Sequence, residues 1–212
     1  MLMALAVLPL LIMAKVVKFP QPTPEKFGFK PVRKRNQETT IVPKQQLSLF
    51  SGGRVVKMGS LGTFEEALIL DEQANPKAKD LYLKAIEEGD CIADAYCNLG
   101  ILESQGNQHS KAIDYFTLSL KHDPRHFEAH YNLANLYAEI GNLLLAKVHY
   151  QMAIQVEPDF PNAHFNLGLT LAMLSESGLA VEELYAYKRL SEISDLRHVD
   201  ELIATISLTK PL

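Results

Sequence analysis

Apolar residues recur with a helical period from Thr63 almost to the C-terminus, without the alternation that marks a β-strand. The pattern opens at Thr63-Phe64-Glu65-Glu66, which has the form of a capping box. In such a box Thr63 and Glu66 each satisfy an unpaired backbone amide at the start of a helix. The pattern therefore predicts an all-α body that begins near residue 59.

The residues before this body have a different texture. Residues 15–58 contain five prolines and three glycines and keep no period, so they bury too little to offset chain entropy and are predicted to form a disordered tail. Residues 1–14 are wholly apolar but shorter than the ~20 residues that a membrane-spanning helix needs. Two interpretations stay open for them. In the first, they form a short membrane anchor, with Lys15 and Lys18 on the cytoplasmic side. In the second, translation begins at Met13 and the residues before it are not made.

The body repeats itself every 34 residues. The positions that recur at this spacing are Tyr96, His130 and His164; Leu99, Leu133 and Leu167; Gly100, Ala134 and Gly168; Ala112, Ala146 and Ala180; Phe116, Tyr150 and Leu184; and Pro124 and Pro158. Small residues at the Gly100 and Ala112 positions would let two helices approach closely.

This pattern resembles the tetratricopeptide repeat, with its aromatic-x2-Leu-Gly-x2-Tyr, Ala-x3-Phe and Pro signature. The resemblance implies an α-solenoid of antiparallel helix hairpins. Full repeats are predicted at 93–126, 127–160 and 161–192, the last divergent at Tyr187 and Glu192. Residues 59–92 form a degenerate first repeat, whose second helix opens at Asn75-Pro76. Residues 193–212 supply a capping helix with an apolar stripe at Leu196, Val199, Ile203 and Ile206.

The charge is divided unevenly along the chain. Residues 15–58 carry ten Lys and Arg against two acidic residues, a net +8, and the remainder carries 11 basic and 23 acidic residues, a net −12. A basic tail is therefore joined to an acidic body. The densest basic cluster is Lys30 with Arg33, Lys34 and Arg35. It is predicted to contact phosphate groups, to act as an import signal or to bind the acidic body, and nucleic-acid binding is not expected.

The resemblance also implies a peptide-binding groove lined by the first helix of each hairpin. The residues at the groove positions are Cys97, Asn98, Ile101, Tyr131, Asn132, Asn135, Phe165, Asn166 and Leu169. Asn98, Asn132 and Asn166 form a ladder of amides that could pair with the backbone of an extended peptide, or else Asn is merely tolerated there. We expect these amides to be exposed and to contribute little to folding. None of the positions is basic, so a clamp for a C-terminal carboxylate is not expected.

The tail holds a second candidate. Gln46, Leu47, Ser48, Leu49 and Phe50 resemble the pentapeptide by which bacterial replication and repair proteins dock on the sliding clamp. Leu49 and Phe50 would fill an apolar pocket on such a partner. The alternative is a short apolar patch that folds back on the first helix.

Motifs for catalysis, cofactors and metals were sought and not found in the sequence. His122, His126 and His130 have the spacing of a metal ladder, but Asp123-Pro124 interrupts the run, so we predict no metal site. Cys91 and Cys97 are too few for a disulfide framework or a four-cysteine zinc site.

We therefore expect a non-enzymatic adaptor that binds a protein or peptide partner and needs no cofactor. The alternative is an accessory protein of DNA metabolism that uses its tail, and an enzyme is a distant third. The expected location is cytoplasmic, or tethered to the inner face of a membrane by residues 1–14.

Overall fold

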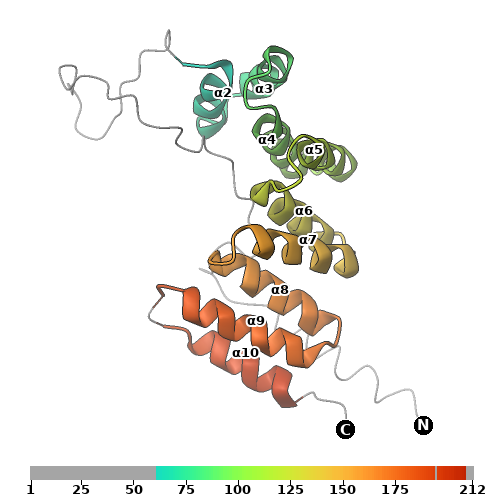
Figure 1. Cartoon of the computed structure of the whole chain (residues 1–212), viewed down its shortest axis with the longest axis vertical. Coiled ribbons are helices and arrows are strands. Elements are labelled where there is room, and N and C mark those ends of the chain that lie inside the picture. The colour runs from blue at the N-terminus through green and yellow to red at the C-terminus, as the bar shows by residue number, and fades with distance from the viewer. Residues whose placement is uncertain (1–60, 194, 209–212) are drawn as a thin grey trace, which may run out of the picture. The chain divides into compact units, whose positions relative to one another are not determined.

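The computed structural model describes residues 61–193 and 195–208, which form nine α-helices and no strand (Figure 1). The predictions made for residues 1–14 and 15–58 lie outside this range. The helices are α2 (Thr63–Glu72), α3 (Lys77–Glu88), α4 (Ile92–Gln105), α5 (His109–His122), α6 (Phe127–Glu139), α7 (Leu143–Val156), α8 (Pro161–Met173), α9 (Ser177–Leu190) and α10 (Arg197–Leu208).

The predicted all-α class and hairpin architecture are confirmed. Each pair α2–α3, α4–α5, α6–α7 and α8–α9 packs as a hairpin, and α10 packs on α9. The helices fall into two compact units, α2 to α5, which ends at Pro124, and α6 to α10, which begins at Arg125. None of the described helices combines the length and the apolar character needed to cross a bilayer.

The first helix starts differently from the prediction. Gly62 is the N-cap of α2, and its N–H donates to the Glu65 carboxylate at 3.1 Å. The predicted capping box of Thr63 with Glu66 is therefore wrong by one residue. Thr63 lies inside the helix, and its hydroxyl donates to the Glu88 carboxylate of α3 instead.

The two helices of a hairpin approach closely at the recurring small positions of the repeat. A Cβ atom built on Gly100 would lie 2.6 Å from the Phe116 ring, and one on Gly168 would lie 2.9 Å from Cγ of Leu184. Contacts this short are not tolerated between real atoms. A side chain at Gly100 or Gly168 would therefore force the facing Phe116 or Leu184 to move, because that side chain occupies the space where the Cβ would lie.

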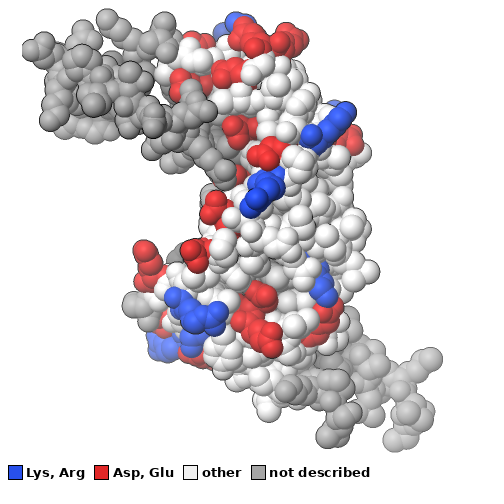
Figure 2. All heavy atoms as spheres, viewed as in Figure 1, with Lys and Arg blue, Asp and Glu red and all other residues white. Residues whose placement is uncertain are grey.

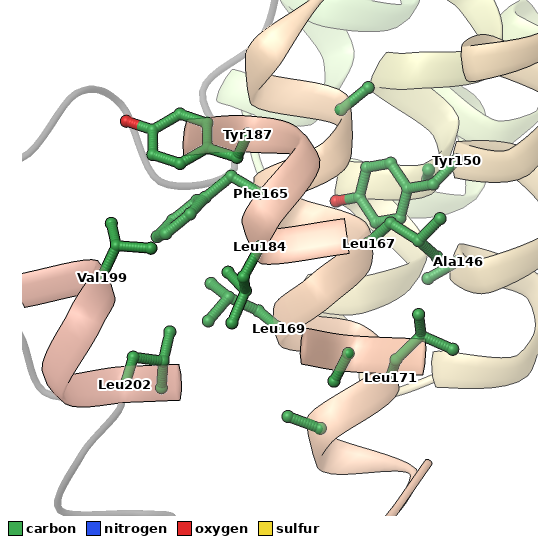
Figure 3. Packing of buried hydrophobic residues seen from close by; sticks show 14 of the residues in the cluster. Ala146, Tyr150, Phe165, Leu167, Leu169, Leu171, Leu184, Tyr187, Val199 and Leu202 are labelled. Carbon is green, nitrogen blue, oxygen red and sulfur yellow. The ribbon is translucent and has the colours of Figure 1, made fainter. Parts of the chain in front are cut away.

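The second unit has one continuous apolar core, which reaches from α6 to α10 (Figure 3). Tyr187 stands where the other repeats have Ala85, Ser119 and Ala153. Its ring is buried against Phe165, with ring centroids 5.0 Å apart. In Figure 3, Val199 of α10 lies beside the Phe165 ring.

The last helix explains why the third repeat departs from the pattern. The buried side of α10 consists of Val199, Leu202, Ile203 and Ile206, and Leu196 before the helix packs partly against the same core. Tyr187 thus belongs to the same apolar core as the buried side of this terminal helix.

Candidate functional site: the first-helix faces

The side chains predicted to line a groove lie on the first helices of the repeats. Cys97, Asn98 and Ile101 are on α4 in the first unit, and the second unit holds Tyr131, Asn132 and Asn135 on α6 and Phe165, Asn166 and Leu169 on α8. We call these sets the first-helix faces. Every one of these side chains is buried, with an exposed fraction of 9% or less. The expectation that the amides are exposed is therefore wrong.

In the second unit the amides form a buried hydrogen-bond network. The Asn166 side-chain amide donates to the Tyr131 hydroxyl at 3.2 Å and to the Asn135 carbonyl at 3.1 Å. The Tyr150 hydroxyl donates to the same Asn135 carbonyl at 2.6 Å. Burial raises the pKa of Tyr150 well above its ordinary value, so this hydroxyl stays a donor. The network ties α6, α7 and α8 together.

The first unit contains a shorter chain of the same kind. Asn98 of α4 donates to the Tyr82 hydroxyl at 3.2 Å, and Tyr82 of α3 donates to the Asp71 carboxylate at 3.0 Å. Burial and the nearby Asp71 charge raise the pKa of Tyr82, and burial raises the pKa of Asp71. Asn98 thus has a structural hydrogen bond and is not merely tolerated beside Leu99.

Two of the three ladder residues, Asn98 and Asn166, donate to tyrosine hydroxyls in these hydrogen bonds. Tyr82 and Tyr150 occupy the same position of the repeat, 16 residues before Asn98 and Asn166. The residue at this position in the intervening repeat is Phe116, which has no hydroxyl. The tyrosine–asparagine arrangement is therefore not repeated at Asn132, and the binding role of the ladder stays a prediction.

The first helices are also distinguished by charge. The residues of α4, α6 and α8 include no Lys or Arg, and their four carboxylates are Asp94, Glu103, Glu128 and Glu139. Glu103 is bound by Lys79 of α3. Figure 2 shows acidic side chains spread over the face in view, with the basic ones gathered in a few separate groups. The helices that carry the first-helix faces thus together have a negative formal charge and no cation of their own.

The three histidines of the interrupted ladder lie in different surroundings. His122 stacks on Tyr96 with ring centroids 5.5 Å apart, in the first unit. His126 caps α6, since its Nδ1 accepts from the Ala129 N–H at 3.1 Å. His130 faces His149. Within the described residues, no three His, Cys, Asp or Glu side chains are grouped as a metal site would require.

Each full repeat has a pair of interacting side chains 19 residues apart, which sequence reasoning missed. The first residue of the pair is on the first helix, at the signature aromatic position, and the second is on the second helix. The pairs are a Tyr–Tyr stack, a His–His pair and a His–Glu ion pair: Tyr96 with Tyr115, His130 with His149, and His164 with Glu183. The constant spacing was the available signal.

The two histidine pairs have opposite electrostatics. His164 contacts the Glu183 carboxylate at 2.7 Å and the Pro158 carbonyl at 2.8 Å, two acceptors that raise the pKa of His164, with the Glu183 contact the larger cause. The Nδ1 atoms of His130 and His149 lie 3.0 Å apart. Burial, together with the neighbouring His130, lowers the pKa of His149 to about 4.

We expect these shifts to give the second unit a pH-dependent stability. The unfolded chain binds a proton at His149 near pH 6.5, whereas the folded chain binds it only near pH 4. The free energy of unfolding therefore decreases as the pH falls through this window. His164 contributes in the opposite sense, because its raised pKa stabilises the fold below pH 6.5 and that stability is lost as the pH rises through the folded pKa.

Urea denaturation at a series of pH values checks this prediction. His149→Tyr, which copies Tyr115 of the preceding repeat, should remove the loss of stability between pH 6.5 and 4. His164→Gln is the matched control and should remove only the stabilisation on the acid side. Identical pH profiles for wild type and His149→Tyr would contradict the assignment.

A second surface also escaped sequence reasoning. Leu144, Val148 and Met152 form a row on α7 at four-residue spacing, with exposed fractions of 66%, 49% and 36%. The repeats before and after have polar or small residues at the first two of these positions. An apolar residue at helical spacing is typical of a core, so the sequence alone did not indicate exposure.

Two family models match the chain, both described as tetratricopeptide repeat, at residues 93–126 and 127–160. Among curated proteins, the chain is 34% identical over 110 residues to human protein O-mannosyl-transferase TMTC3, which covers 50% of this chain and 12% of the relative. It is 30% identical over 118 residues to mouse tetratricopeptide repeat protein 8, covering 56% of this chain and 22% of the relative. The chain thus spans less than a quarter of either relative.

Solved structures with the same fold are less similar in sequence. MamA (41-end) from Desulfovibrio magneticus RS-1 matches with a TM-score of 0.59 at 16% identity, covering 69% of this chain and 82% of that one. The first TPR of Spaghetti (RPAP3), bound to the HSP90 peptide SRMEEVD, matches with a TM-score of 0.51 at 18% identity. The match covers 55% of this chain and 90% of that one. The TPR2B domain of yeast Sti1, in complex with an Hsp70 peptide, matches with a TM-score of 0.51 at 21% identity. The match covers 56% of this chain and 98% of that one.

Proposed function

Since the chain is a tetratricopeptide repeat protein, we propose that it is a non-enzymatic adaptor that binds an extended segment of a protein partner along the first-helix faces of α6 and α8 in its second unit. The observation that carries the proposal is the presence of an aromatic side chain followed by an amide at the same positions of these two helices, Tyr131 with Asn132 and Phe165 with Asn166. Amides pair with the backbone of an extended peptide whatever its sequence, and aromatic rings add apolar contact area. Peptide complexes of two proteins with this fold support it.

The charge of the first helices sets the class of peptide. The HSP90 peptide SRMEEVD bound by the RPAP3 domain has three acidic residues. In this chain α6 and α8 together carry two carboxylates, Glu128 and Glu139, and no Lys or Arg, so an acidic peptide would meet like charge with no cation from these helices to bind it. The preferred ligand is therefore an extended peptide that is neutral or basic, recognised without a free C-terminal carboxylate.

A peptide array tests this preference. Full-length protein is applied to blocked peptides graded by net charge, together with SRMEEVD bearing a free carboxyl terminus. We expect binding to increase with positive charge and SRMEEVD to bind no better than a scrambled control. Preferential binding of acidic peptides that depends on the free carboxylate would contradict the proposal.

The other predicted roles depend on residues that the structure does not describe. The sliding-clamp-like motif Gln46 to Phe50 and the basic cluster around Arg33 both lie before residue 61. A role in DNA metabolism and a cytoplasmic or membrane-tethered location stay predictions.

A further inference from the structure

The first helices of the second unit are buried around their whole circumference. Residues 163–172 of α8 are all buried, a run of ten, and residues 129–136 of α6 are buried in the same way. Successive helical residues point 100° apart, so a run of this length covers every direction. By contrast, α7 buries only Ala146, Tyr150 and Ala153. The burial of α6 and α8 therefore includes the first-helix faces, which are the faces proposed to bind a partner.

The chemistry of the first-helix faces of α6 and α8 suits a cationic segment. Glu128, Asn132, Asn135 and Glu139 follow one another along a single side of α6, so a carboxylate lies at each end of the amide row. The adjacent rings are Tyr131 of α6 and Phe165 of α8, and neither helix contributes a Lys or Arg. Amides, aromatic faces and carboxylates together recognise an extended backbone that carries Lys, Arg and aromatic side chains.

One segment of the same chain has this composition. Residues 26–35 read Lys-Phe-Gly-Phe-Lys-Pro-Val-Arg-Lys-Arg, with five cations, two aromatic rings and no acid. The sequence of the segment, with its proline and glycine, is unfavourable for a helix. Because the segment belongs to the same chain, its effective concentration at a site on that chain does not depend on the protein concentration, unlike that of an outside peptide.

We propose that residues 26–35 bind the first-helix faces of α6 and α8 within the same chain and compete there with outside peptides. The competition rests on the proposed function, whereas the intramolecular contact can be measured without any partner. The contacts are individually weak and partly screened by salt, so the occupancy falls as ionic strength rises. An outside peptide would have to displace the segment to bind.

Photo-crosslinking in the full-length chain tests the contact. Benzoylphenylalanine is placed at position 29, and the crosslinked peptides are identified by mass spectrometry. We expect crosslinks within one chain to residues of α6 and α8. The yield should fall to the level of the same probe at position 19 when Lys30, Arg33, Lys34 and Arg35 are all replaced by Glu, or in 1 M NaCl.

Other outcomes would overturn the proposal. Crosslinks only between two chains would assign the surface to a second copy, and crosslinks to α6 and α8 from a probe at position 50 but not 29 would assign it to the Gln46–Phe50 motif. As a second readout, the four-Glu variant should bind the strongest basic array peptide several-fold more tightly than wild type, with a smaller gain at high salt. Equal affinities would exclude competition while leaving the proposed function intact.

Discussion

Replacing Phe116 by Ala should lower the free energy of unfolding by roughly 3–5 kcal/mol, the usual cost of deleting a buried aromatic ring. The Phe116 side chain is fully buried, and its ring occupies the space directly over Gly100. Because Gly100 of α4 has no side chain, the space left by a smaller residue at position 116 of α5 would stay unfilled. Urea denaturation followed by circular dichroism measures the loss.

A double-mutant cycle with Gly100 shows whether the effect comes from this contact. Gly100→Val alone should destabilise by about 1–3 kcal/mol, since its Cβ would lie 2.6 Å from the ring. In the Phe116→Ala background the same valine enters the vacated space, so the combined loss should be clearly smaller than the two single losses together. Leu144→Ala, at an exposed site on α7, is the control and should change stability by no more than about 0.5 kcal/mol. Additive single losses would contradict the predicted close approach.

Replacing Asn166 by Ala should lower the free energy of unfolding by about 1–3 kcal/mol, because it removes two hydrogen bonds between buried groups. The groups affected are the Tyr131 hydroxyl and the Asn135 carbonyl. The melting temperature should fall measurably in a thermal denaturation experiment.

Tyr150→Phe is the matched variant, since it removes only the hydroxyl that donates to the same Asn135 carbonyl at 2.6 Å. The two substitutions should not be additive, because they act on one acceptor. An Asn166→Ala change within about 0.5 kcal/mol of wild type would mean that the amide is exposed, as the sequence alone suggested.

The sequence was sufficient to predict the fold because its period reflects a repeated packing contact. The residues 34 apart at the Gly100 and Ala112 positions are those at which helices meet closely, and this requirement recurs in each hairpin. The capping helix was predicted for a similar reason, since the stripe at Val199, Ile203 and Ile206 must be buried. The start of α2 was misplaced because Glu65 and Glu66 both suit a capping box, and only the backbone decides between them.

The state of the candidate site was harder to predict. A recurring Asn fits both a binding ladder and a structural amide, and the difference lies in a partner on a neighbouring helix. Tyr82 is 16 residues before the Asn98 amide that it meets, and Tyr150 is 15 residues after the Asn135 amide that it meets, spacings that have no meaning until the helices are packed. The exposure of Leu144 on α7 is equally invisible in a helical period, which fixes the side of a helix and not whether another element covers it.

The central claim is that the first-helix amides contact an extended, neutral or basic peptide, and side-chain amide NMR tests it most directly. Full-length protein labelled with nitrogen-15 is titrated with the strongest basic array peptide, and the Asn132 resonance is identified by its loss in Asn132→Ala. We predict that the Asn132 and Asn135 side-chain signals shift in proportion to occupancy, and that SRMEEVD leaves them unchanged. Two results would contradict this expectation. One is a set of backbone amide shifts confined to Leu144, Val148 and Met152 of α7, and the other is an equal shift of the Asn132 and Asn135 signals with SRMEEVD.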